Sequence, residues 1–313
     1  MMRAWLQLLR IALAPSVIWD AIAGSLIATA VLQHRFTEAA AESGASAATP
    51  PRLELATLGA TIAVLLCVFH AGMAWNDWRD RAIDQEAGRK RPLADGRISA
   101  QAGFLAGAVL FALGLGLAAL FLPERLDTVA ILCGIVALYD LGGKALRAVA
   151  GPVLLALCRI LSLGLGMLVV LEPVDIAKTS ALGGLLAYGL YLLFLARLAA
   201  NEEEGLPGPK AIVPVAACAF APVVFPYFDQ GSLTLFVPAW LLFAAWLVRP
   251  ALRDRHIVWS PTRVQSAVRR CLMGMPLIPA LALLSGTAPA WWAAGGLLTM
   301  GVSRVLVRRF PPE

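Results

Sequence analysis

Three aspartates spaced three and four residues apart are the first residues in this chain that could do chemistry. Asp77, Asp80 and Asp84 follow a long apolar run, in the segment WNDWRDRAID at 75–84. On a helix, positions i, i+3 and i+7 lie on one face, so the three carboxylates point the same way. Stacked like charges repel one another unless a cation lies between them. Mg²⁺ suits such hard oxygen ligands, because it takes one or two carboxylates and completes its shell with water and phosphate oxygens.

A basic stretch, GRKRPLADGRIS at 88–99, follows directly. An NDxxDxxxD motif that closes a second apolar run, followed by RPLxxGxIS opening a third, resembles the UbiA family of membrane prenyltransferases. The resemblance implies a helical bundle around a central cavity, a Mg²⁺-bound isoprenyl diphosphate and transfer of the prenyl chain to an acceptor. It implies Asp77 and Asp80 as catalytic residues and metal ligands, Asp84 as a further ligand that contacts substrate, and Asn76 and Arg91 as substrate-binding residues.

The alternative interpretation of the acidic motif is a charged helix end at which Arg79 and Arg81 pair with the aspartates. The aromatic residues beside it also allow two interpretations. Phe69, Trp75 and Trp78 could stabilise a carbocation through their ring faces, or they could pack and anchor the helix at the membrane interface.

Two further polar groups close or interrupt later apolar runs. Tyr139 and Lys144, in YDLGGK, resemble the family's Tyr and Lys near the diphosphate and are assigned to substrate binding; the alternative is a lysine that only ends a helix. Arg159 lies inside an apolar run, where an arginine is expensive and is either paired or functional. Two interpretations stay open: an ion pair with Asp20 in the first run, or contact with substrate.

The segment RLAANEEEG at 197–205 departs from the family pattern. UbiA enzymes usually carry a second Asp-rich motif of the DxxxD kind here, whereas this chain has adjacent glutamates. Consecutive helical positions diverge by about 100°, so one or two of these side chains can face a cavity. We expect Glu202 to act as a catalytic residue and metal ligand, with Asn201 contacting substrate. The departure indicates a divergent subgroup of the family.

The composition places these residues in a membrane. Of the 313 residues, 59% are hydrophobic and 15% are charged, whereas soluble domains carry about 25% charged residues. This excludes a soluble enzyme and a disordered chain. Ten apolar runs approach the ~20 residues that span a bilayer: 12–33, 54–75, 101–122, 127–143, 149–171, 178–199, 211–227, 232–248, 267–286 and 288–305. We expect one all-α integral membrane domain over 1–313, a UbiA-like bundle of about nine core transmembrane helices with a tenth C-terminal segment, and we expect 34–53 to be a solvated loop.

The distribution of charge predicts the orientation. With the N-terminus inside, 21 of the 26 lysines and arginines fall in cytoplasmic segments and four fall outside, as the positive-inside rule requires. The net charge of +6 therefore belongs to loops at the lipid bilayer, not to a nucleic-acid surface. The N-terminus and all the polar clusters face the cytoplasm in this arrangement, and we expect the membrane to be the bacterial inner membrane.

These observations favour a Mg²⁺-dependent prenyltransferase whose partners are a polyprenyl diphosphate, an unidentified apolar acceptor and the lipid bilayer. One alternative is a non-catalytic relative that binds or moves an isoprenoid lipid or pigment precursor, which the altered 201–205 segment would suit. An unrelated transporter is less favoured, because the two halves lack a paired broken-helix pattern.

Overall fold

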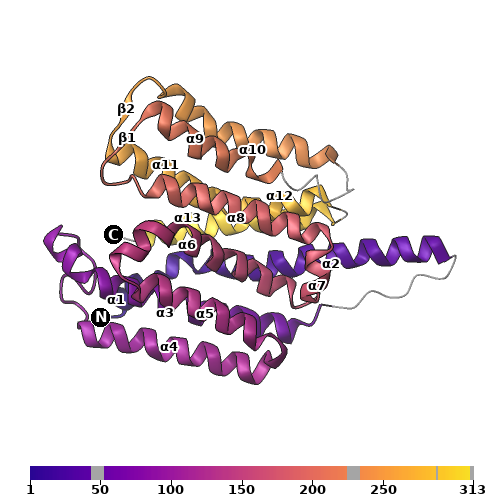
Figure 1. Cartoon of the computed structure of the whole chain (residues 1–313), viewed down its shortest axis with the longest axis horizontal. Coiled ribbons are helices and arrows are strands. Elements are labelled where there is room, and N and C mark those ends of the chain that lie inside the picture. The colour runs from indigo at the N-terminus through magenta and orange to yellow at the C-terminus, as the bar shows by residue number, and fades with distance from the viewer. Residues whose placement is uncertain (44–52, 224–232, 287, 311–313) are drawn as a thin grey trace.

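The structure of the chain is a computed structural model that describes residues 1–43, 53–223, 233–286 and 288–310. Its long helices run side by side along one axis (Figure 1). The elements in chain order are α1 (Met2–Leu8), η1 (Ile11–Leu13), α2 (Ala14–Ser43), α3 (Leu55–Glu86), α4 (Ala100–Phe121), η2 (Pro123–Arg125), α5 (Leu126–Leu141), α6 (Lys144–Met167), α7 (Pro173–Ala177), α8 (Ser180–Ala199), β1 (Leu206–Pro207), α9 (Gly208–Phe220), α10 (Leu233–Arg253), β2 (Val258–Trp259), α11 (Pro261–Gly274), α12 (Leu277–Ser285), η4 (Ala290–Ala293) and α13 (Ala294–Arg309).

The all-α membrane architecture is confirmed, but the count of nine core helices is not. Within the described residues, seven helices are long and apolar enough to cross a membrane, or eight if the pair α11 and α12, bent by 42°, forms one span. The predicted span 267–286 is this broken pair. The predicted loop 34–53 is also partly wrong, because α2 continues as a helix to Ser43. Part of 211–227 and the first residue of 232–248 lie outside the described residues.

The outer surface of the bundle is apolar, as contact with hydrocarbon requires. Leu242 on α10 is 74% exposed and Leu298 on α13 is 69% exposed. Exposed aliphatic side chains of this kind also run along α4, where Leu105 and Val109 face outward. Patches of this extent on a water-soluble monomer would cause association, whereas lipid chains cover them without cost.

Small residues let the central helices approach closely. A Cβ atom at Gly24 of α2 would lie 2.2 Å from the backbone oxygen of Leu163 on α6, and one at Gly166 would lie 2.4 Å from that of Ala21. The pair α3 and α4 is similar, since a Cβ at Gly107 would lie 2.5 Å from the Trp75 ring. Close backbone approach at small residues is the usual source of helix packing in lipid, where no hydrophobic force drives helices together.

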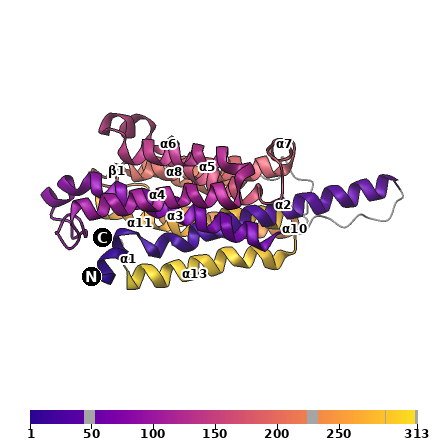
Figure 2. The same ribbon diagram turned by 90° about the horizontal axis from the view of Figure 1, so that it is seen from below.

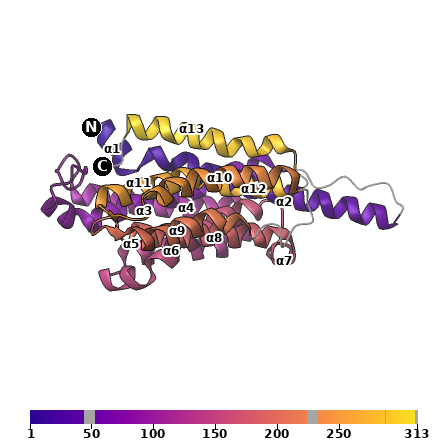
Figure 3. The ribbon, with the colours of Figure 1, turned by 90° about the horizontal axis from the view of Figure 1, so that it is seen from above.

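The break between α11 and α12 falls at Pro276, which cannot donate a backbone hydrogen bond. Trp19 of α2 donates its indole N–H to the Pro276 carbonyl oxygen at this break, at 2.8 Å. The same ring fills the space above Gly295, where a Cβ would lie 2.1 Å from it. The first long helix is therefore fastened to the last two, and α13 lies along α2 on one flank of the bundle (Figure 2 and Figure 3).

Several polar segments that are distant in sequence meet at one end of the bundle. The N-terminus, the turn between α3 and α4 and the β1–β2 ladder all lie at that end, and α7 lies at the other (Figure 1). The ladder pairs Leu206 with Trp259 and Pro207 with Val258 in antiparallel register. Ser99 caps α4 by accepting a hydrogen bond from the backbone N–H of Ala102. These segments bring the polar residues of the chain together.

Asp20 and Arg159 form a buried ion pair inside the bundle. Arg159 Nη2 lies 2.8 Å from Asp20 Oδ2, and the hydroxyl of Tyr188 on α8 donates to Asp20 Oδ1 at 2.8 Å. Arg159 Nη2 also donates to Tyr188 Oη and to the Ser16 carbonyl oxygen. Of the two interpretations of Arg159, the structure contains the paired one. These contacts do not favour the expectation that Arg159 binds substrate.

We expect Arg159→Leu to lower the free energy of unfolding by about 3–5 kcal/mol, because it leaves Asp20 as an uncompensated buried charge. The double variant Asp20→Asn, Arg159→Leu should recover part of this loss. Thermal unfolding of the purified protein in detergent measures both. A double variant no more stable than Arg159→Leu would show that the two charges do not neutralise each other.

Candidate active site

The three aspartates occupy the last turns of α3, where the helix emerges from the apolar bundle. Asp77 and Asp84 are 3% and 1% exposed, while Asp80 is half-buried. As the spacing predicts, the carboxylates of Asp77 and Asp84 lie on one side of the helix, and both are buried. Ionised carboxylates in such a place require cationic partners.

A single guanidinium nitrogen bridges these two carboxylates. Arg91 Nη1 lies 2.9 Å from Asp84 Oδ2 and 3.3 Å from Asp77 Oδ1. Arg89 Nη1 donates to the other oxygen of Asp84 at 3.0 Å. Arg10 Nη2 donates to Asp77 Oδ1 at 2.9 Å from the break between α1 and η1. The basic stretch after α3 thus folds back onto the acidic motif.

Arg10 has a left-handed backbone conformation, with φ of 49°. This conformation costs a non-glycine residue of the order of 1 kcal/mol. This conformation turns the chain sharply between α1 and η1. From this turn, the guanidinium of Arg10 reaches the carboxylate of Asp77.

Asp80 belongs to a second group of contacts, on the side of α5 and α6. Arg147 Nη1 lies 3.2 Å from Asp80 Oδ1, and Arg79 Nε donates to the same oxygen at 3.1 Å. Arg79 also donates to Asn76 Oδ1 and to the backbone oxygen of Tyr139. The Arg147 guanidinium lies 5.2 Å from the centroid of the Tyr139 ring. Asn76 and Tyr139 are therefore joined to Asp80, not to the Asp77–Asp84 pair.

Arg79 pairs with Asp80 as the alternative interpretation of the motif supposed, but Arg81 does not follow it. Arg81 contacts the Trp78 ring and backbone oxygen on its own helix. The side chains of Trp75 and Trp78 pack against Phe104 of α4. The structure thus uses both tryptophans for packing between α3 and α4.

Asp140 is a buried carboxylate that was not predicted as a site residue. Its Oδ1 atom has no hydrogen-bond partner within the described residues, and the residue is 3% exposed. It lies against Gly72 of α3, where a Cβ would be 2.7 Å from Asp140 Oδ2. The neighbouring residue Lys144 begins α6, and its side chain lies outside the described part of the structure.

The acidic segment after α8 meets the basic stretch after α3. The Glu203 carboxylate pairs with the Arg89 guanidinium, which also holds Asp84. Glu202 is half-buried, and this burial raises the pKa of its carboxyl, with Arg269 opposing the rise. Glu203 is exposed, so Glu202 is the more enclosed of the two glutamates; its role as a catalytic residue and metal ligand stays a prediction.

Asn201 lies just after the end of α8, and its predicted contact with substrate stays a prediction. Its side-chain N–H donates to the backbone oxygen of Arg197 at 2.9 Å, so the amide completes the end of its own helix. The turn that follows ends at Gly205, whose φ is 80°. A Cβ there would also lie 2.5 Å from the Trp259 carbonyl oxygen, so both the conformation and the space require glycine.

The carboxylates do not form the four-residue metal set that the sequence predicted. Among the residues that the structure describes, no three or more His, Cys, Asp or Glu side chains are grouped so as to hold a metal ion. The pair Asp77 and Asp84 nevertheless fits Mg²⁺ in its chemistry: two hard oxygen donors share one cationic atom, and this metal needs only one or two carboxylates when phosphate oxygens complete its shell.

Comparison with known proteins fits this arrangement. The model of the UbiA prenyltransferase family matches residues 39–202, more than half of the chain and the whole of the acidic and basic motif. The chain belongs to the UbiA prenyltransferase family.

Two curated relatives share short stretches with this UbiA family member. Polyprenyl transferase spyF of Aspergillus fumigatus is 48% identical over 50 residues, which cover 14% of this chain and 15% of that protein. The 6-hydroxymellein 5-farnesyltransferase cdmH of Talaromyces verruculosus is 40% identical over 68 residues, 19% of this chain and 21% of that protein. The chain thus matches about a fifth or less of the length of either relative.

One solved structure shares the fold over nearly the whole length of this chain. A structure reported for digeranylgeranylglyceryl phosphate synthase has a TM-score of 0.55 and 15% identity, and the match covers 95% of this chain and 100% of that one. A UbiA homologue from Archaeoglobus fulgidus, solved with GPP and Mg²⁺, has a TM-score of 0.47 and 15% identity, covering 97% and 99% of the two chains.

Removing Arg91 tests whether the stability of the protein depends on a cation between Asp77 and Asp84. We expect Arg91→Gln to lower the free energy of unfolding by about 1–3 kcal/mol, because Asp77 and Asp84 each lose one of two cationic partners. Added MgCl₂ should raise the thermal midpoint of this variant more than that of the wild type. Lys90→Gln, at the exposed neighbouring position, is the matched control and should change neither value. Equal responses to MgCl₂ in all three proteins would contradict a cation position between the two aspartates.

Proposed function

We propose that this chain is a membrane prenyltransferase that moves a prenyl group from a polyprenyl diphosphate to an apolar acceptor with the help of Mg²⁺. The observation that carries the proposal is the pair of buried carboxylates, Asp77 and Asp84, which share one cationic nitrogen at the polar end of an apolar bundle. Family membership supports the same reaction class.

The reaction breaks the bond between C1 of the allylic prenyl chain and the diphosphate oxygen. The diphosphate leaves with the electron pair, the acceptor forms a new bond to C1, and the acceptor gives up a proton. Diphosphate is a poor leaving group until its charge is neutralised. Mg²⁺ held by Asp77 and Asp84 would supply part of this neutralisation when bound.

Three arginines of the chain are placed to supply the rest. Arg10, Arg89 and Arg91 converge on the same two carboxylates from two different segments. Guanidinium groups form paired, charge-assisted hydrogen bonds with phosphate oxygens, so these arginines suit an anion at this position. The apolar interior of the bundle would hold the prenyl chain and keep water from the carbocation. Glu202 is half-buried and interacts electrostatically with Arg89, and we propose that it is the catalytic residue of the second acidic segment.

The charge asymmetry of the loops supports a cytoplasmic position for this end of the bundle. The alternative function, a non-catalytic relative that binds or moves an isoprenoid lipid, is favoured by one observation. Asp77 and Asp84 pair with Arg10, Arg89 and Arg91, so arginines alone can balance their charge.

Release of diphosphate separates these two functions. Purified protein is incubated with MgCl₂ and a panel of prenyl diphosphates of different lengths, and free diphosphate and binding by calorimetry are measured. We expect release by the wild type, and we expect Asp77→Ala and Asp84→Ala to abolish Mg²⁺-dependent binding. Tight binding without release in the wild type supports the non-catalytic relative. If both variants bound prenyl diphosphate with the Mg²⁺-dependent affinity of the wild type, the assignment of the site would be wrong.

The two adjacent glutamates provide a second test with a matched control. We expect Glu202→Gln to lower prenyl transfer at least ~10-fold, equivalent to about 1.4 kcal/mol of transition-state stabilisation, because it removes the enclosed carboxylate. Glu203→Gln should change the rate little, since Arg89 keeps its contact with Asp84. Turnover of labelled prenyl diphosphate in membranes measures both. Near-normal rates in both variants would mean that the segment is only a solvated acidic loop.

A further inference from the structure

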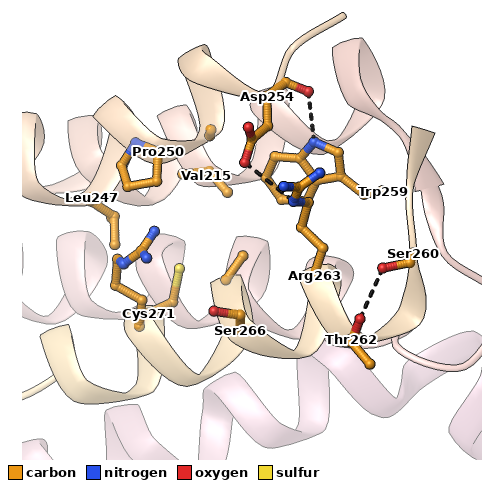
Figure 4. A pocket seen from close by; sticks show the side chains of 13 residues that line it. Val215, Leu247, Pro250, Asp254, Trp259, Ser260, Thr262, Arg263, Ser266 and Cys271 are labelled. Carbon is orange, nitrogen blue, oxygen red and sulfur yellow. Dashed lines mark hydrogen bonds and ion pairs between the residues drawn. The ribbon is translucent and has the colours of Figure 1, made fainter. Parts of the chain in front are cut away.

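A pocket of about 440 Å³ lies away from the α3 aspartates, between α9, α10, β2 and α11 (Figure 4). No residue of α3 or of the basic stretch after it lines this pocket. The lining combines a polar side, formed mainly by α11, with an apolar side, formed by α9 and α10. Neither the UbiA motif nor the proposed reaction makes use of these residues.

The polar side consists of residues on one face of α11. Arg263, Ser266 and Arg270 stand at positions i, i+3 and i+7, so all three side chains point to the same side of the helix. Arg263 Nε lies 3.2 Å from Asp254 Oδ2 and is neutralised by it. The side chains of Arg270 and Ser266 form no hydrogen bond or ion pair with any residue in the described ranges 1–43, 53–223, 233–286 and 288–310. The pocket therefore offers an uncompensated positive charge beside a hydroxyl group.

The apolar side identifies the kind of anion that fits. Val215 of α9 and Leu247, Pro250 and Ala251 of α10 line it. The pocket lies where α10 ends and α11 begins, at the polar end of the bundle. A ligand that satisfies both sides carries a phosphate group on a hydrocarbon body. Basic pockets between transmembrane helices near the membrane surface are known as sites for lipid headgroups of this type.

Helix α11 separates this pocket from the proposed active site. Arg269 interacts electrostatically with Glu202, whereas Arg270, the next residue, lines the pocket. Consecutive residues diverge by about 100° around a helix, so the two arginines serve different sides of α11. An anion bound at Arg270 would therefore lie on a different side of α11 from Glu202.

We propose that this pocket binds the phosphate group of an anionic membrane lipid. Arg270 and Ser266 contact the phosphate, and the hydrocarbon of the lipid lies against α9 and α10. The proposal goes beyond the prenyl-transfer function and does not depend on it.

Lipid binding to the purified full chain in detergent tests the proposal by native mass spectrometry. Phosphatidylglycerol and phosphatidylcholine with the same acyl chains are titrated, and inorganic phosphate is titrated separately. We expect selective binding of phosphatidylglycerol that Arg270→Gln weakens about 10-fold, while Arg270→Lys retains most of it. The matched control is Arg253→Gln, which removes an exposed charge at the end of α10 that does not line the pocket.

Thermal unfolding checks that Arg270→Gln is folded, and Ser266→Leu, which fills the pocket with an apolar side chain, is the second variant. Weaker phosphatidylglycerol binding in both pocket variants, with Arg253→Gln unchanged, supports the proposal. Equal losses in Arg270→Gln and Arg253→Gln would assign the binding to general surface charge and overturn it. Arg270-dependent binding of inorganic phosphate without selective lipid binding would overturn the lipid assignment, as would unchanged lipid binding in Ser266→Leu.

Discussion

The neutralisation of buried negative charge governs the polar end of this molecule. Asp77 and Asp84 lie almost fully out of water at the end of an apolar helix, where an unpaired carboxylate would cost several kcal/mol. Their partners come from the segment before α2 and from the turn after α3. Meeting this requirement draws the N-terminal segment and the α3–α4 turn onto α3, and Arg89 extends the network to Glu203 after α8.

The same arginines that pair with the aspartates can, in the proposed reaction, also pair with an anionic ligand. An arginine that neutralises a carboxylate keeps unused N–H donors in its planar guanidinium group. In the proposed reaction, a cation between the carboxylates would free Arg91 for phosphate oxygens. The negative charge of Asp77 and Asp84 would then be balanced by the bound cation, and Arg91 would balance the charge of the phosphate.

Local patterns in the sequence predicted much of the fold, and long-range contacts limited the rest. The run 101–122 corresponds closely to α4, because hydropathy alone decides where an uninterrupted span lies. Residues 34–43 were assigned to a loop because they are polar, yet their alanines and glutamates are good helix formers. The aspartates were found from their helical spacing, but Arg10 and Arg147 each contact an aspartate 67 residues away, and no spacing rule reports such a distance. The hydrogen bond from Tyr188 to Asp20 was not predicted either, because a tyrosine in an apolar span looks like any core residue.

The hydrogen bond from Trp19 to the Pro276 carbonyl oxygen joins residues 257 positions apart. Inside a bilayer, where water is absent, the indole N–H needs an acceptor from the protein. This bond therefore cannot form until the helices α11 and α12 have entered the membrane beside α2. During synthesis, the first long helix must wait with its indole N–H unpaired while most of the chain is inserted. The contact between α2 and the α11–α12 break is thus a late event in biogenesis, and a chain cut short before Pro276 would leave α2 without it.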